Sequence, residues 1–435
     1  MVGQAKKLVD SLVLEKAKGN KDIENFIRVK LSMKGIPVSS LTESSADDPI
    51  VINKIKDVLK EFGANAMKIK SVFSEKKSVA EAAADIKEQL AEFDVTMLVF
   101  FASWEAYDHD KISAEMQSAF PNAVVYGCSS HTEICNDKTL TSSVTAMAFS
   151  PEVISDVKVE VLEKISDKVD VKSAFKSFDA YFKTPMATAD YKEYSGIVLV
   201  DSFSAKEEEV MDKIGNQTNI VFVGGSASDA LKFDKTYVYA NGKAYSDAAL
   251  LAVFKTKKGV DYIKTQSFDV TDTKLTVTKA DPKRRAVIEF DHKPAAVRYA
   301  EALEIDRSEI DSEFFAAPVG MVVDNDVYIR SCLRADGDTM IFHCGMMEGM
   351  NLKICKIRNI IPDTKKAVED KAKELGSIAG IVDFRCVRRT IQMTDENTLD
   401  DYAAIFNGIP TIGFSTYGEE FLGHINQTST MLVFK

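Results

Sequence analysis

Three glycine–serine segments, each followed by an acidic side chain, are the clearest candidates for chemistry in this sequence. Residues 127–133 (GCSSHTE) and 413–419 (GFSTYGE) share the spacing G-x-S-x-x-x-E, and Gly225-Ser226 precedes Asp229. The carboxylates of Glu133, Glu419 and Asp229 could each bind an ammonium group at the end of its loop. The alternative is structural, with each acid capping the hairpin or helix that follows.

Two arginines are candidates for the opposite charge. Arg330 and Arg389 could each offer a bidentate guanidinium, which is the group that a carboxylate ligand prefers. Acids and arginines together would form a site for a zwitterion such as an amino acid. The alternative is that these arginines pair with the acids only to stabilise the fold.

Other chemistries have weaker support. The glycine–serine segments could bind phosphate through backbone N–H groups, but neither G-x-G-x-x-G nor G-x-x-x-x-G-K-[ST] occurs. Cys128 or Cys386 could be a nucleophile, with His131 close to the former, although a buried cysteine acting as a small hydrophobe is the preferred interpretation. The histidines show neither H-x-x-x-H nor H-E-x-x-H spacing, so the sequence does not support a metal site.

The elements that must position these residues form a repeated pattern. Residues 97–133, 197–229 and 381–419 each read as strand, helix, strand and then a glycine–serine loop that ends in an acid. Such a unit predicts a right-handed βαβ crossover with parallel strands. The loops should therefore emerge at the carboxyl ends of the strands, which is the edge where open α/β sheets bind ligands.

The flanking segments differ in character. Residues 1–63 read as helices only, with apolar stripes that include Ile27, Leu31, Ile55 and Leu59. They predict a small helical hairpin that packs on the main body or on a partner. Residues 256–285 are polar and charged and are the best position for a domain boundary.

Composition excludes several classes of partner. The 435 residues predict two to four domains at about 150 residues each. A net charge of −11 without a long basic run argues against nucleic acid and anionic membranes. The cysteines form no C-x-x-C pair, and no stretch of 18 apolar residues occurs, so we expect a reduced, cytoplasmic protein that does not span a membrane.

Several motifs in order resemble the FIST family. The pattern LVFFAS…AVVYGCSSHTEI, followed by VFVGGSASDALKFDKTYVYANGKAYSDAALLAV, is similar to the FIST N-terminal domain. The pattern KPAAVRYAEALEI…VYIRSCL…MEGMNLKI…FRCVRR…IGFSTYGE…HINQTST is similar to the FIST C-terminal domain. The resemblance implies domains at residues 66–255 and 286–435 after a helical extension at 1–63. The expected fold is α/β, with repeated βαβ units and mixed sheets in two lobes.

The resemblance also implies a function. FIST domains look like sensory input modules that bind small ligands such as amino acids, so we expect a non-enzymatic sensor with a ligand crevice between α/β lobes. Its expected partner is a signalling protein of the kinase or chemoreceptor type. The alternatives are a haem-linked gas sensor and a cysteine-dependent acyl- or thiol-transfer enzyme; the sequence identifies no cofactor.

The candidate ligand-binding residues combine the loops, the arginines and the family motifs. Loop one departs from the family by placing His131-Thr132 where small residues and glycine are usual, whereas the C-terminal motifs are intact. The candidates are Gly127, Cys128, Ser129, Glu133, Asp201, Gly225, Ser226, Asp229, Arg330, Cys386, Arg389, Ser415, Tyr417, Glu419, His424 and Asn426.

Overall fold

A computed structural model describes residues 3–17, 21–42, 44–45, 47–55, 68–324 and 326–435. They belong to two compact units, Met1–Lys68 and Ile69–Lys435. In the first unit α1 (Gln4–Ala17) and α2 (Lys21–Met33) bury an apolar cluster that includes Val9 and Leu31. The expected helical extension is therefore present. Backbone at residues 49–55 is also helical, whereas Leu59 lies outside the described residues.

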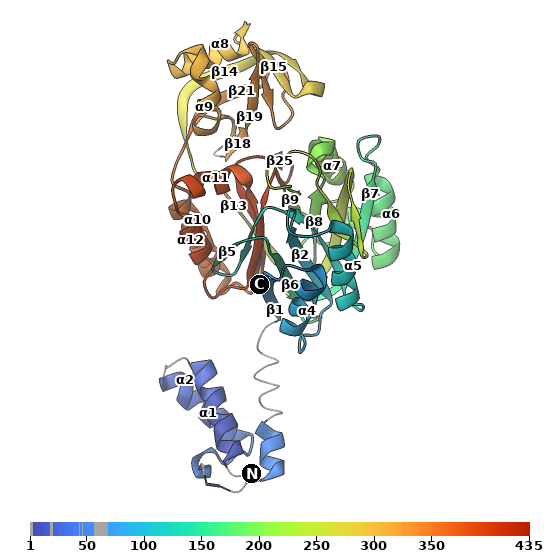
Figure 1. Ribbon diagram of the computed structural model, residues 1–435, viewed down its shortest axis with the longest axis vertical. Helices are drawn as coiled ribbons and strands as arrows, with labels where there is room; N and C mark the ends of the chain where they lie inside the picture. The colour runs from blue at the N-terminus through green and yellow to red at the C-terminus, as the bar shows by residue number, and fades with distance from the viewer. Residues whose placement is uncertain (1–2, 18–20, 43, 46, 56–67, 325) are drawn as a thin grey trace. The chain divides into compact units, whose positions relative to one another are not determined.

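The second unit consists of three repeats with one order of elements, strand–helix–strand–helix–strand, then a hairpin and a last strand (Figure 1). The first comprises β1 (Ile69–Ser74), α4 (Val79–Gln89), β2 (Met97–Ser103), α5 (His109–Ala119), β3 (Val124–Ser130), β4 (Thr132–Cys135), β5 (Lys138–Thr141) and β6 (Val144–Phe149). The second comprises β7 (Ile154–Glu163), α6 (Val171–Phe182), β8 (Tyr194–Val200), α7 (Glu207–Gly215), β9 (Phe222–Ser226), β10 (Val238–Ala240), β11 (Lys243–Tyr245) and β12 (Ala248–Thr256). The third comprises β13 (Val260–Thr265), α10 (Ile360–Leu375), β22 (Gly380–Cys386), α11 (Val387–Asp395), α12 (Leu399–Ala404), β23 (Thr411–Thr416), β24 (Glu419–Phe421), β25 (His424–Ile425) and β26 (Ser429–Phe434).

Each repeat contains the parallel strand pair that its sequence pattern predicts. The pairs are β2 with β3, β8 with β9, and β22 with β23. The last strand of each repeat returns antiparallel beside the first strand of the pair. All seven residues of β2 are buried, as its unbroken apolar run indicates. The predicted mixed α/β fold is confirmed.

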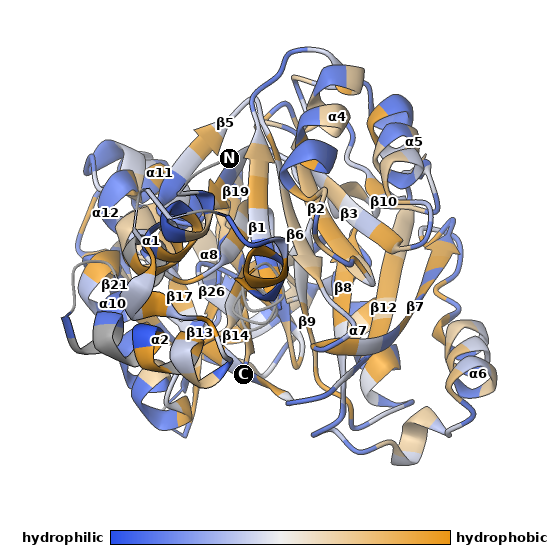
Figure 2. Cartoon of the chain, turned by 90° about the horizontal axis from the view of Figure 1, so that it is seen from below, coloured by the Kyte–Doolittle hydropathy of each residue, from blue (hydrophilic) through white to orange (hydrophobic). Residues whose placement is uncertain are grey.

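The hairpin of each repeat pairs with a strand of another repeat, and the three pairings form a closed cycle. The sequence pattern does not predict this exchange. The hairpin of the first repeat pairs with β23 of the third, that of the second with β3 of the first, and that of the third with β9 of the second. Each sheet therefore contains strands from two repeats. The three sheets share one apolar core, and Figure 2 shows their strands coloured predominantly hydrophobic.

A β-rich lobe, residues 268–357, is inserted in the third repeat between β13 and α10, and Figure 1 shows it at one end of the unit. Its strands are β14 (Phe268–Asp281), β15 (Ala286–Phe290), β16 (Lys293–Pro294), β17 (Val319–Val323), β18 (Asp326–Arg330), β19 (Cys332–Asp336), β20 (Thr339–Phe342) and β21 (Asn351–Ile357). Helices α8 (Ala295–Leu303) and α9 (Ile310–Ala316) pack on its own core. The polar segment at residues 256–285 is thus the place where the chain enters the lobe through β13 and β14.

Candidate functional site

Glycines at the start of the first two loops are required by the close approach of neighbouring strands. A Cβ at Gly127 would lie 1.7 Å from the carbonyl oxygen of Phe100, and a Cβ at Gly224 would lie 1.7 Å from that of Val198. Gly225 faces the third repeat, where a Cβ would lie 2.5 Å from Cγ2 of Thr416. These glycines permit sheet formation at the point where each loop begins.

The acid of loop one is enclosed by hydroxyl groups. Ser103, Ser130 and Ser143 donate hydrogen bonds to the Glu133 carboxyl at 2.8, 2.5 and 2.8 Å, and Glu133 has no exposed surface. Burial raises the pKa of Glu133 to about 8. The three serines lie at the ends of β2 and β3 and just before β6, so the carboxyl holds three strand ends together.

The other repeats contain the same type of cluster. Glu419 accepts hydrogen bonds from Thr416 Oγ1 at 2.8 Å and from the Thr428 backbone N–H at 2.9 Å, and burial raises its pKa to about 7. In the second repeat the carboxyl comes from the end of β8 instead, where Asp201 accepts from the Thr236 hydroxyl and the Asp247 N–H. Glu133, Glu419 and Asp201 are thus engaged in closing strand ends.

Asp229 positions an aromatic side chain from another repeat. Its carboxylate accepts a hydrogen bond from the Tyr417 hydroxyl and from the backbone N–H of Asp234 at 2.7 Å. The Tyr417 hydroxyl also accepts from the Leu231 N–H at 2.8 Å, and the ring stacks on Phe233 with centroids 5.6 Å apart. The candidates Asp229 and Tyr417 are therefore brought together.

Three further candidates, two in the third repeat and one in loop one, form hydrogen bonds with other residues of the fold. Arg389 donates to Thr364 Oγ1 at 2.9 Å and is 3% exposed. Ser415 accepts from Nη2 of Arg385, a fully buried arginine that the sequence analysis did not select. Ser129 donates to the carbonyl oxygen of Ser228 at 3.0 Å. Ser226 and Cys128 are also fully buried.

A cavity of about 1400 Å³ lies where the β-rich lobe meets α7, α11 and the loop from β23 to β25. Five of the candidates line it, namely Arg330, Cys386, Tyr417, His424 and Asn426. Further titratable lining residues, which sequence reasoning missed, include Glu207, Glu208, Arg285, His343 and Arg388. The loop acids Glu133, Asp229 and Glu419 lie outside this lining.

A buried histidine forms part of the cavity lining. Nδ1 of His424 lies 3.0 Å from Oε1 of Glu420, and both residues are at most 5% exposed. Although burial alone would lower it, the pKa of His424 is raised to about 9 because Glu420, Glu207 and Glu208 face the ring. Nδ2 of Asn426 lies 3.4 Å from the other ring nitrogen, while its buried Oδ1 atom has no partner.

A mostly buried ion pair links the lobe to the second repeat beside the cavity. Nη2 of Arg285 lies 2.8 Å from Oε2 of Glu207 and 2.5 Å from Oε2 of Glu208, while Nη1 donates to the His343 carbonyl oxygen. Glu208 also accepts from the Gly345 N–H at 2.6 Å. These contacts engage Arg285, and Arg284, which also lines the cavity, pairs with Asp336.

Two arginines of the lining have no carboxylate partner among the described residues. Arg388 donates to the carbonyl oxygen of Cys332 at 2.8 Å and lies 3.4 Å from Nε2 of His343; burial lowers its pKa. Nε of Arg330 is buried without a hydrogen-bond partner. Arg330 comes from the end of β18 and Arg388 from α11, so the two guanidinium groups approach the cavity from the lobe and the third repeat. Arg388 is the first arginine of the CVRR motif, whereas the sequence pattern selected the second, Arg389.

The cysteines and the other potential ligands give no support to redox or metal chemistry. Burial raises the pKa of the Cys128 and Cys386 thiols, so neither is a thiolate at neutral pH. Throughout the described part of the chain, no three His, Cys, Asp or Glu side chains gather so as to hold a metal ion. Within the same residues, no helix combines the length and apolar character needed to cross a bilayer.

Comparisons with known proteins identify two matched regions. The family model described as FIST N domain matches residues 96–293, and that described as FIST C domain matches residues 295–421. FIST domains are associated with sensory signal transduction. The chain is also 29% identical over 241 residues to the uncharacterized protein MJ1623 of Methanocaldococcus jannaschii. That match covers 51% of this chain and 45% of the relative, so the chain spans under half the length of this relative.

Proposed function

Because this chain belongs to the FIST family, we propose that it is a cytoplasmic sensor whose cavity binds a small molecule that carries a carboxylate, such as an amino acid or a simple carboxylic acid. The observation that supports this most is the pair Arg330 and Arg388, which line the cavity without a carboxylate partner. Guanidinium groups that are withdrawn from water favour an anion, and a carboxylate matches their geometry.

The remaining polar atoms suit the rest of such a ligand. The side-chain amide of Asn426 is a buried polar group on the cavity lining with one atom that lacks a partner, so it can form a hydrogen bond with a polar group of the ligand. The acids at Glu207 and Glu208 are already paired with Arg285. An amino acid would therefore place its carboxylate at the arginines and a second polar group beside the amide of Asn426.

In this proposal the ligand signal passes through the contact between the β-rich lobe and the repeats. Arg330 belongs to the lobe and Arg388 to the third repeat, so a ligand that binds both favours one arrangement of the two parts. It can shift that equilibrium only by its difference in affinity for the two arrangements. A partner protein of the kinase or chemoreceptor type would bind one of the two arrangements preferentially. Residues 66–255 and 286–435 would act as the two FIST domains.

The test is a thermal-shift screen of the full chain against amino acids and simple carboxylic acids. A ligand at about 100 times its Kd should add about 2.7 kcal/mol to the free energy of unfolding. Arg388→Gln and Arg330→Gln should each abolish the shift, whereas Arg334→Gln, an exposed arginine outside the cavity lining, should retain it. Absence of a shift with every acid at millimolar concentration would overturn the proposal.

A further inference from the structure

Exposed apolar side chains of residues 69–435 gather at the cavity. Most large apolar side chains that are exposed in this unit belong to the cavity lining, among them Phe203, Leu231, Phe233, Met347, Ile391 and Leu422. Phe233 is 59% exposed and Leu422 is 75% exposed. Scattered single apolar residues are normal on a protein surface, whereas a group beside a polar pocket indicates a place where apolar material binds.

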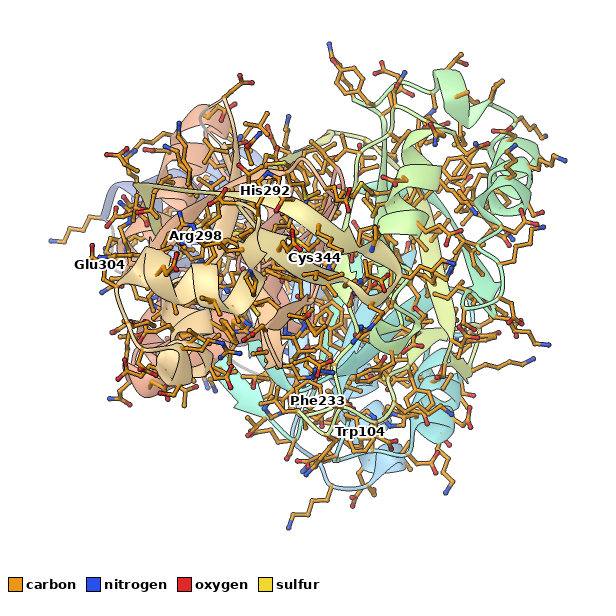
Figure 3. All side chains as sticks on the ribbon, turned by 90° about the horizontal axis from the view of Figure 1, so that it is seen from above. Trp104, Phe233, His292, Arg298, Glu304 and Cys344 are labelled. Carbon is orange, nitrogen blue, oxygen red and sulfur yellow. The ribbon has the colours of Figure 1, made fainter. Side chains whose placement is uncertain are left out.

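The aromatic part of this lining is held in place. Tyr417 lies between Phe203 and Phe233, with ring centroids 6.1 and 5.6 Å away. Its hydroxyl donates to Asp229 and accepts from the Leu231 N–H, and these hydrogen bonds favour the orientation in which the ring lines the cavity. Figure 3 shows Phe233 at the edge of the repeats, outside the β-rich lobe that carries His292, Arg298 and Cys344.

The volume of the cavity also indicates a ligand with a large apolar part. Sites for drug-sized ligands typically measure roughly 300–1,000 Å³, and this cavity measures about 1400 Å³. An amino acid with a short side chain at Arg330 and Arg388 would leave the aromatic lining in contact with water. A larger ligand that buried this apolar lining would gain the favourable free energy of removing apolar surface from water.

We infer that the ligand is an amphipathic carboxylate whose head group lies at Arg330 and Arg388 and whose alkyl or aryl body covers the aromatic lining around Tyr417. This inference rests on the proposed function, since it specifies the class of carboxylate that the same cavity takes. The common chemistry is one anionic group joined to an apolar body larger than a short amino-acid side chain.

Isothermal titration of the full chain with two series of acids tests the inference. The alkyl series runs from propanoate to decanoate, and the aryl series from benzoate to 5-phenylpentanoate. Each methylene that enters the apolar part should tighten binding about three- to fourfold. The double variant Phe233→Ala/Leu422→Ala should flatten this dependence, while Tyr191→Ala, an aromatic of similar exposure outside the lining, should not.

The outcomes separate this inference from the proposed function. If all acids of both series bound with equal affinity and Arg388→Gln abolished this binding, the inference would be overturned. The proposed carboxylate site would then still be supported. A dependence on length that persists in Phe233→Ala/Leu422→Ala would also overturn it. No binding by any acid, or binding that Arg330→Gln and Arg388→Gln leave unchanged, would overturn the proposed function itself. A steeper dependence for one series identifies the alkyl or the aryl body as the preferred one.

Discussion

Nδ1 of His424 lies 3.0 Å from Oε1 of Glu420, and this pair is buried beside the cavity. The carboxylates of Glu207 and Glu208 also face the ring, while Arg388, Arg285 and His343 are the cationic or titratable neighbours of the same site. The acids raise the pKa of His424 by more than burial lowers it, so this pKa rises to about 9. These acids therefore hold the ring in its protonated form at neutral pH.

The pair predicts a specific pH dependence of stability. The pKa of His424 is about 6.5 when unfolded and about 9 when folded, so the folded state binds more protons between these values. Its contribution to the free energy of unfolding should be complete below pH 6.5 and lost as the pH rises through 9. Urea unfolding of the native chain and His424→Gln from pH 6 to 10 measures this. A difference between them that stays constant over this range would contradict the assignment.

The carboxyl of Glu133 should contribute to stability and not to ligand binding. Glu133→Ala removes the acceptor for Ser103, Ser130 and Ser143 and should destabilise the chain by about 3 kcal/mol. Glu133→Gln keeps an acceptor oxygen and should cost less. Both variants, where folded, should retain the affinity of the native chain for carboxylates in titration calorimetry; a loss of affinity at full folding would instead place Glu133 in the ligand site.

Glu133 also predicts a loss of stability at rising pH. Its pKa is about 4.5 unfolded and about 8 folded, so the folded state again holds the extra proton. Stability should therefore fall as the pH rises from 4.5 through 8, relative to Glu133→Gln, which has no such proton. Parallel unfolding curves of the two proteins across that range would show that the carboxyl is ionised in the fold.

The ion pair of Arg285 should contribute more to the free energy of unfolding than the ion pair of its neighbour Arg284. Arg285→Met leaves Glu207, whose side chain is 5% exposed, without its partner and should cost about 3 kcal/mol. Arg284 pairs with Asp336 at an exposed site, so Arg284→Met should cost less than about 1 kcal/mol. Denaturant unfolding of both variants compares them directly, and equal losses would contradict the role given to the buried pair.

The loop glycines give a test of the repeat geometry. A Cβ at Gly127 would meet the Phe100 carbonyl at 1.7 Å, so Gly127→Ala should separate β2 from β3 and leave little folded protein. Gly215, at the end of α7, has no neighbouring atom within 4 Å of such a Cβ, so Gly215→Ala should be tolerated. Circular dichroism melting separates the two, and a normal melting temperature for Gly127→Ala would contradict the strand register.

The strand–helix–strand units could be predicted from the sequence because periodicity is a local signal. The cyclic exchange of hairpins could not, because the alternation in residues 132–141 or 238–245 specifies a strand and not its partner. The same limit applies to the site. The spacing of Glu133 and Glu419 marks a repeated feature, but it does not identify every hydroxyl group that encloses these carboxyls, since Ser103 lies 30 residues from Glu133.

The cavity depends on an insertion that has no periodic signal. Family motifs predict Arg330, Tyr417, His424 and Asn426 as ligand-binding residues, and all four line the cavity. Arg285 and His343 have no motif of their own, and they reach the cavity because the β-rich lobe is inserted between β13 and α10. Sequence patterns therefore selected residues that line the cavity but not the arrangement that joins them.

Native mass spectrometry of the chain with decanoate or 5-phenylpentanoate tests the central claim most directly. The account predicts one bound acid per chain for the native protein and for Arg334→Gln, and none for Arg330→Gln/Arg388→Gln at the same concentration. An unmodified mass for the native chain at millimolar acid, or an equally occupied double variant, would contradict it.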